Sequence, residues 1–209
     1  MSNRISKKAL VPASARIKTY YDTKKVEQNG SIINFFPANA TRKVTRDNYV
    51  NNPFPGAMKR RILGLAFEVT NQFIEDDPEN GIDAIAIVNG LKDAAILLQA
   101  DNDNKEFLRA PMSEFSNFAG TGLQYVSATD NTTDAEAVFK RIATLKSAGE
   151  YRLADPFDLA QNQTVSLAVH FDDSSVFPTE AGWTASGQGS LWLRASLVVA
   201  EVETNRGNS

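Results

Sequence analysis

The feature that most constrains the fold is a strict alternation of apolar and polar residues in the C-terminal third of the chain. Every second residue of Thr164–Phe171 is apolar, and Leu191–Val202 shows the same alternation over a longer stretch. Successive side chains of a β-strand point to opposite faces, so a period of two predicts strands with one buried face. Both segments therefore favour a fold in which β-sheets enclose the core.

Short segments rich in β-branched and aromatic residues predict further strands upstream. They are Arg16–Tyr21, Ser31–Phe36, Arg61–Val69, Ala95–Gln99 and Lys105–Ala110. Asn29-Gly30, between the first two, predicts a hairpin, because this dipeptide suits the tightest β-turns. The sequence thus predicts a mostly β fold, a single jelly roll or β-sandwich of about eight antiparallel strands.

Two short helical insertions are predicted between the strands. Apolar residues recur at threes over Asp83–Asp93, which indicates a helix. Thr133 and Glu136 form a capping box at the start of Asp134–Lys146, whose apolar residues share one helical face. The Gly- and Pro-containing segment before the last strand is expected to be a loop.

One domain with two tails is expected from this pattern. Residues 1–16 are polar and basic and show no periodicity, which predicts a flexible N-terminal arm. Residues 17–203 are predicted to form the β domain, and residues 204–209 a polar C-terminal tail. The sequence offers neither a signal-peptide core nor an apolar run of the ~20 residues that a membrane-spanning helix needs. We therefore expect synthesis in the cytoplasm without secretion.

Charge is distributed unevenly along the chain. Residues 1–61 contain 13 Lys and Arg against 3 acids, whereas the other 148 residues contain 9 Lys and Arg against 22 acids. Such asymmetry predicts contact between the basic segment and nucleic acid or anionic lipid. The alternative is that the two parts neutralise each other within the fold or between subunits. The predicted anion-facing residues are Arg4, Lys7, Lys8, Arg16, Lys18, Lys24 and Lys25.

The sequence offers little for catalysis or metal binding. It contains no cysteine, which excludes disulfides, thiolate metal sites and cysteine nucleophiles. His170 is the single histidine, and it lies on the polar face of a predicted strand. The polar run Asp101–Glu106 lacks the glycine of a calcium-binding loop and is better explained as a hairpin tip. We expect no enzyme activity, no cofactor, no metal and no small-molecule substrate.

Two tryptophans are candidates for contacts with other molecules. Trp192 and Arg194 lie on the outward parity of the last strand, whose apolar residues on both faces indicate that both faces are covered. The cover would be a helical insertion or a neighbouring subunit. Trp183, in the Gly-rich loop, could anchor a protein contact or a sugar. We predict Trp183, Trp192 and Arg194 as subunit contacts.

Four features together resemble the jelly-roll capsid proteins of icosahedral bacteriophages, including phages with a membrane beneath the shell. They are the basic N-terminal arm, the Pro-rich loop Asn48–Gly56 before Arg61–Val69, the segment Tyr151–Leu159 before Thr164–Phe171, and the long final strand Leu191–Val202. The chain is too short for the two jelly rolls of the double-barrel members, so one is expected.

The resemblance implies a virion structural protein that self-assembles into a capsid shell. Its partners would be copies of itself and other virion proteins, and its arm would face the genome or an internal membrane. A ligand-binding β-sandwich is the alternative, a carbohydrate-binding or receptor-binding module that would use Trp183 and Tyr125.

Overall fold

The computed structural model describes residues 15–38, 46–48, 52, 54, 58–69, 73–100, 105–115, 122–128, 138–144, 150–160 and 163–203. The strands are β1 (Arg16–Lys25), β2 (Ile32–Phe35), β3 (Met58–Val69), β4 (Phe73–Glu75), β5 (Ala95–Ala100), β6 (Lys105–Pro111), β7 (Gly122–Ala128), β8 (Val138–Thr144), β9 (Tyr151–Leu159), β10 (Val165–His170) and β11 (Trp192–Glu203). The helices are α1 (Ala84–Asp93), α2 (Glu180–Ala185) and the short 3-10 turns η2 (Pro78–Asn80) and η3 (Met112–Glu114).

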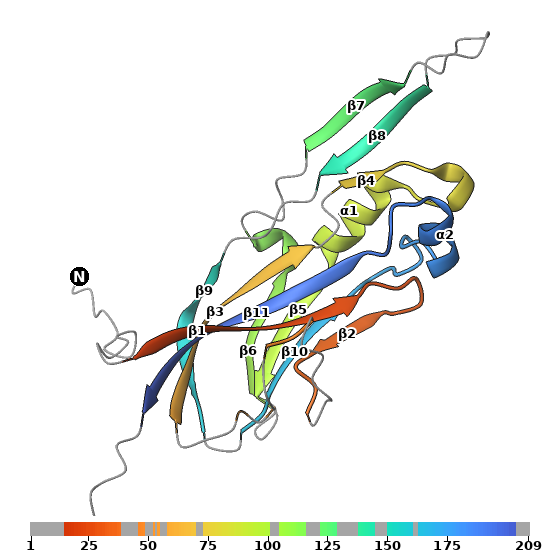
Figure 1. Ribbon diagram of the computed structural model, residues 1–209. Helices are drawn as coiled ribbons and strands as arrows, with labels where there is room; N and C mark the ends of the chain where they lie inside the picture. Colours follow the sequence, from red (N-terminus) through yellow and green to blue (C-terminus); the bar gives the residue numbers. More distant parts are fainter. Residues whose placement is uncertain are drawn as a thin grey trace, which may run out of the picture.

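Eight strands form two antiparallel sheets that face each other (Figure 1). Their orders are β1-β11-β3-β9 and β2-β10-β5-β6. If these eight strands are counted along the chain, the first pairs with the last, the second with the seventh, the third with the sixth and the fourth with the fifth. This is one long antiparallel hairpin wound around a sandwich, the arrangement of a jelly roll. The predicted fold class is confirmed.

The remaining strands form a small third sheet at one end of the sandwich. Its order is β4-β8-β7, and it is inserted between β3 and β5 and between β6 and β9. Figure 1 shows β7 and β8 extending away from the end at which α1 and α2 lie, while β1 begins and β11 ends at the opposite end. Both insertions thus lengthen connections at one end of the jelly roll.

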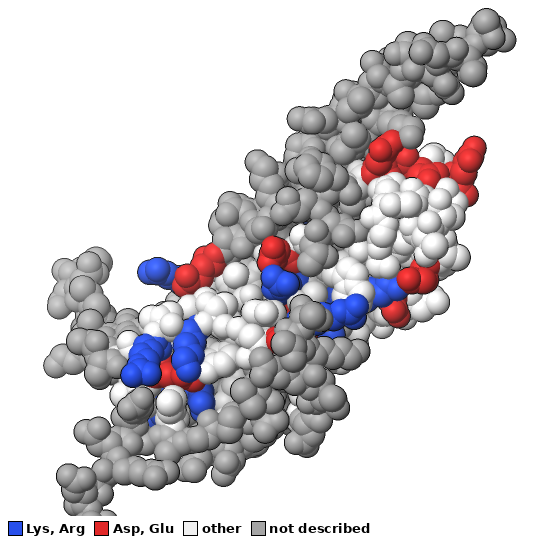
Figure 2. Space-filling model, in the orientation of Figure 1, with Lys and Arg blue, Asp and Glu red and all other residues white. Residues whose placement is uncertain are grey.

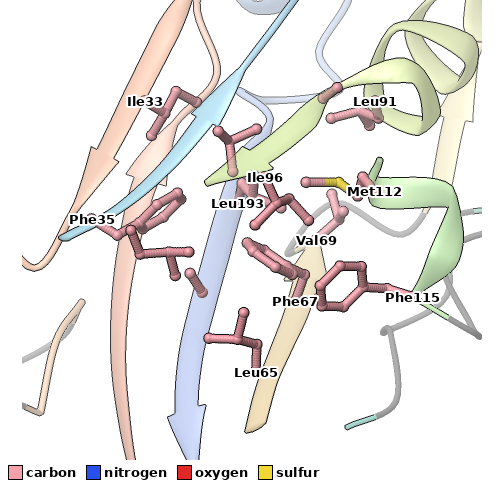
Figure 3. Close-up of a cluster of buried hydrophobic side chains, with 14 of the residues drawn as sticks. Ile33, Phe35, Leu65, Phe67, Val69, Leu91, Ile96, Met112, Phe115 and Leu193 are labelled. Carbon is pink, nitrogen blue, oxygen red and sulfur yellow. The ribbon is translucent and has the colours of Figure 1, made fainter. Parts of the chain in front are cut away.

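The core is built from apolar side chains of both main sheets. Figure 3 shows Phe67 of β3 between the two layers, where its ring centroid lies 6.4 Å from that of Phe35 and 5.1 Å from that of Phe115. The alternating residues of β10 and β11 predicted to face inward, such as Leu167 and Leu193, are fully buried. The period of two therefore identified the core face correctly.

A bulge in β3 changes which of its residues face inward. Ile62 and Leu65 are both fully buried, and the pairing register shifts between Ile62 and Gly64. Leu63 is only half-buried, because an extra residue at a bulge reverses the parity of one side of the strand. Beyond the bulge, Phe67 and Val69 are buried.

Gly64 is required by the close approach of β9 at this bulge. A Cβ atom at Gly64 would lie 2.6 Å from the carbonyl oxygen of Tyr151, a backbone atom that cannot rotate away. We expect Gly64→Ala to lower the free energy of unfolding by about 1–3 kcal/mol, measured by urea denaturation. Gly30→Ala is the control, because its Cβ would meet nothing closer than 3.5 Å. Equal stability of the two variants would contradict this packing.

Three sequence predictions about local structure are wrong. The Asn29-Gly30 turn does not form a hairpin, because β1 and β2 pair with β11 and β10 in different sheets. The predicted helix Asp134–Lys146 contains β8, paired along its length with β7. The segment predicted as a loop before β11 contains α2, whose N-cap Thr179 accepts the Gly182 N–H at 3.1 Å.

The first helical insertion is confirmed, and nearby acids explain where it begins. Asp83 caps α1 by accepting the N–H groups of Ile85 and Ala86 at 2.9 and 3.0 Å. Asp76 accepts the Ala84 N–H at 2.8 Å, and Asp77 caps η2. Carboxylates at helix starts satisfy backbone donors that have no partner within the helix. Asp76, Asp77 and Asp83 therefore have structural roles at the starts of these helices.

Candidate functional site

The basic residues predicted to face an anion fall into two groups. Arg4, Lys7 and Lys8 lie outside the described residues. Arg16, Lys18, Lys24 and Lys25 belong to β1, which pairs with β11 along its whole length. The second group is therefore part of the sandwich and not of a flexible arm.

The three lysines of β1 form ion pairs inside the chain. Lys18 Nζ lies 2.8 Å from Glu201 Oε2, Lys24 Nζ lies 3.2 Å from Asp22 Oδ2, and Lys25 pairs with Glu180. These ion pairs balance the charges of Lys18, Lys24 and Lys25 within the fold. Contact of these three lysines with an external anion stays a prediction. Figure 2 shows basic side chains next to acidic ones among the described residues of this face.

Glu201 is the centre of a buried polar cluster at the end of the sandwich where β1 begins. Its carboxylate accepts hydrogen bonds from Tyr20 Oη at 2.6 Å and Arg60 Nε at 2.8 Å, in addition to the Lys18 ion pair. Burial alone would raise the pKa of Glu201, but the hydrogen bonds from Lys18, Tyr20 and Arg60 lower it below its ordinary value. The cluster keeps Glu201 ionised.

A second buried polar group fixes the chain after β2. Phe36 is buried and has a left-handed backbone with φ 55°. Its N–H donates to Asp22 Oδ2 at 2.9 Å, and its carbonyl accepts from Asn52, which also hydrogen-bonds the backbone of Val165. Burial raises the pKa of Asp22, and the bond from Phe36 opposes that rise. These contacts hold a non-glycine residue in a strained conformation.

The segment Arg46–Asn48 lies against the outer edge of β1. Asn48 donates its N–H to the Tyr21 carbonyl at 3.2 Å, accepts the Tyr21 N–H at 2.6 Å, and donates Nδ2 to the Thr19 carbonyl at 2.8 Å. Arg46 stacks over Trp192, 3.7 Å from the ring centroid. This segment therefore closes the middle of an edge strand that could otherwise pair with another chain.

Trp192 and Arg194 lie on the outer face of β11, as their parity predicts. Arg194 donates to Thr23 at 3.2 Å and to Glu68 at 3.1 Å, and its guanidinium lies 4.7 Å from the Tyr21 ring centroid. Both side chains are thus partly covered by their own chain. Contact with another subunit through Trp192 and Arg194 stays a prediction.

Trp183 is not at the surface. It lies in α2 with only 1% of its surface exposed, and it is part of the hydrophobic core. The prediction that it anchors a subunit contact or a sugar is wrong, because the short helix turns its side chain inward. The glycines around it predict a loop, and the helix α2 was missed.

The described residues show no constellation typical of catalysis. No group of three or more His, Cys, Asp or Glu among them could hold a metal ion. His170 lies on the outer face of β10, opposite Ile32 and Ala95. A cavity of about 400 Å³ lies between η2 and α2, and Glu79 is the one ionisable residue of its lining. In the same described part of the chain, no helix is both long and apolar enough to cross a membrane.

Sequence reasoning missed the buried polar residues Asp22, Asn52 and Glu201 and the half-buried Asn48. One of them carries a signal in hindsight, because Glu201 follows a run of apolar residues within the predicted last strand. Asp22 lies one residue beyond the predicted strand Arg16–Tyr21 and gives no such signal. Charged residues are rarely buried without a partner, so an acid inside a predicted core strand indicates a buried ion pair. The amides of Asn48 and Asn52 give no such signal.

No known protein family, curated protein or solved structure matches this chain. The fold and the contacts described above are therefore the basis for any statement about function.

Proposed function

We propose that this protein is a virion structural subunit that assembles with copies of itself into an icosahedral capsid. The observation that carries the proposal is the jelly-roll strand order, β1-β11-β3-β9 facing β2-β10-β5-β6. Viral capsid proteins are one of the protein classes built on this fold. Because a fold hosts many functions, the proposal depends on an assembly test.

The surface chemistry is in keeping with a structural role. The charged residues of the described part serve largely as helix caps and ion pairs, as at Asp83 and Arg61–Asp158. We expect no catalytic activity and no cofactor. The ligand-binding alternative loses its main support because Trp183 is buried.

In this proposal the anion-facing part is limited to the residues before β1. Arg4, Lys7 and Lys8 precede the sandwich, and no acid occurs in residues 1–15. This segment would contact the genome or an internal membrane, and its partners would include other virion proteins. Neutralising phosphates with basic residues makes binding weaken steeply as salt rises.

Assembly of the purified full-length chain tests the proposal. We expect light scattering and negative-stain microscopy of a concentration series to reveal closed shells or ring-shaped oligomers. A species that stays monomeric at every protein and salt concentration would contradict it.

Nucleic-acid binding tests the basic segment separately. The triple variant Arg4→Gln, Lys7→Gln, Lys8→Gln should bind DNA or anionic vesicles more weakly than the wild type. The slope of log K for DNA binding against the logarithm of the salt concentration should be smaller in magnitude by about 2–3. The matched control replaces three basic residues outside the N-terminal segment by glutamine: Lys59, Lys92 and Arg152. Equal losses in both triples would show that the N-terminal segment has no special role.

A further inference from the structure

We propose that two copies of this chain join through β2, whose outer edge pairs antiparallel with β2 of the second copy around a two-fold axis. Ile32 of one copy then lies opposite Asn34 of the other. The inference rests on the proposed self-assembly and specifies one of its contacts. β2 is an outer strand of the sheet β2-β10-β5-β6, so one of its edges is turned away from β10 (Figure 1).

The direction of the backbone groups on β2 follows from its pairing with β10. The Ser31 carbonyl accepts the Phe171 N–H at 2.8 Å, so Ser31 faces β10. Because the direction of these groups alternates along a strand, Ile32 and Asn34 direct their N–H and C=O groups away from β10. Among the described residues, none forms a hydrogen bond with these four groups. The outer edge of β2 therefore offers two donors and two acceptors on one side.

The side chains beside this edge are exposed. Ile32 is 48% exposed and is one of two large hydrophobic residues that the described part of the chain leaves exposed. Asn34 is exposed as well. An open strand edge next to an exposed isoleucine readily pairs with another chain, and natural sheets usually prevent such pairing. β2 therefore has the features of a strand that pairs with another molecule.

The other three outer strands of the main sheets carry features that hinder pairing. Asn48 bonds to the outer edge of β1. β6 contains Pro111 and β9 contains Pro156, and a proline has no N–H to donate to a neighbouring strand. Charged residues, which also discourage edge pairing, occur in all three strands. β2, by contrast, contains neither a proline nor a charged residue.

A second copy of this chain is the occupant that fits such an edge. Because β2 carries no charge, pairing of β2 with itself places no like charges opposite each other. A two-fold contact uses the same edge of both copies, so it closes at the dimer and leaves neither edge open for polymerisation. Symmetry thus replaces the protection that the sequence of β2 lacks.

The hydrogen-bonding groups determine the register of the pair. The N–H and C=O of Phe36 already bond to side chains of the same chain, and the Gly30 N–H bonds within its own turn. A two-fold axis at Ile32 or at Asn34 would place these occupied groups in the ladder. An axis at Ile33 instead pairs Ile32 with Asn34 twice and satisfies all the outward groups of both residues in each copy.

Such a short ladder is a small contact, so we expect the isolated dimer to be weak. In a shell, further contacts between copies raise the effective concentration of the two facing edges. A covalent cross-link therefore detects this contact best. The chain contains no cysteine, so engineered thiols are the only thiols present.

We expect an equimolar mixture of Ile32→Cys and Asn34→Cys chains to form mixed disulfide dimers on oxidation. In the proposed register these two positions are hydrogen-bonded neighbours with Cα atoms about 5.5 Å apart, which suits a disulfide. Two copies of one position lie on a diagonal about 7–8 Å apart, so each variant alone should cross-link several-fold less. Mass spectrometry of the cross-linked peptides identifies which positions are joined.

The matched control is Ile17→Cys, the same substitution at a similarly exposed isoleucine of β1. Cross-linking of this control as extensive as that of the mixture would contradict a specific contact through β2. Assembled particles without the mixed disulfide, as expected if the edge received a strand from another virion protein, would overturn the contact while leaving self-assembly intact. Mixed dimers without any larger assembly would support the contact and contradict the capsid proposal. A chain that never associates would overturn both proposals.

A backbone variant gives a second readout. Ile32→Pro removes an outward N–H in each copy without removing a bond to β10. We expect this variant to fold normally and to dimerise about tenfold more weakly or worse. Ile32→Thr keeps the N–H and should remain within about threefold of the wild type. Sedimentation velocity measures dimerisation, circular dichroism verifies folding, and equal association of the proline and threonine variants would contradict strand pairing.

Discussion

Glu201→Ala is expected to lower the free energy of unfolding by about 3–5 kcal/mol, because it leaves a buried cation without its partner. The Arg60 side chain is only 10% exposed and would keep its charge in the core, while Lys18 at 48% exposed can turn to water. Tyr20 would also lose the acceptor of its hydroxyl. Urea denaturation at neutral pH measures the loss.

The matched control is Glu106→Ala, which removes the exposed partner of Arg109. Exposed pairs contribute about 0–1 kcal/mol, so this variant should remain close to the wild type. A loss from Glu201→Ala no larger than that of the control would show that the cluster does not hold the end of the sandwich together.

Acid should weaken the same cluster, and the sign follows from the direction of the pKa shift. The pKa of Glu201 is lower in the folded chain than its ordinary value. Its stabilisation is therefore present above the ordinary glutamate range and is lost as pH falls through the folded pKa. We expect the stability difference between the wild type and Glu201→Gln to shrink on acidification from pH 7 to pH 3. A pH-independent difference would contradict this.

Trp183→Ala is the second variant with a large expected effect, a loss of about 3–5 kcal/mol from removing a buried aromatic side chain. In a chain of this length that corresponds to a melting temperature roughly 10 °C lower. The reason is that α2 inserts Trp183 into the core, where its side chain is 1% exposed. Thermal unfolding followed by circular dichroism measures the change.

Trp183→Phe distinguishes the effect of losing side-chain volume from the effect of removing the indole N–H. Within the described part of the chain, the Trp183 Nε1–H has no hydrogen-bond partner. Phenylalanine keeps most of the apolar volume and removes that donor, so we expect a loss well below that of the alanine variant. If both variants were as stable as the wild type, Trp183 would not be a core residue.

The fold class could be predicted from the sequence, because apolar and polar residues alternate along the two C-terminal core strands. Thr164–Phe171 and Leu191–Val202 each bury the parity predicted to face inward, which is the pattern of strands that enclose a core between two sheets. Local signals failed where tertiary contacts decide the outcome. The capping box at Thr133 predicted a helix, but β8 obtains its hydrogen bonds from β7 and β4.

The candidate surfaces were less predictable than the fold. Parity correctly put Trp192 and Arg194 on the outer face of β11. Ion pairing of Lys18 with Glu201 joins residues far apart in sequence, and no local pattern reports it. The contact of Asn48 with the outer edge of β1 could not be predicted either, because it joins residues that are distant in the sequence.

The winding of the long hairpin has a consequence for the order of folding. Tyr20 and Glu201, 181 positions apart, are neighbours in the finished sheet. β1 can therefore pair in the sandwich only after β11 has been translated, and a topology dominated by such distant contacts folds slowly. The sheet β1-β11-β3-β9 is thus completed late in synthesis.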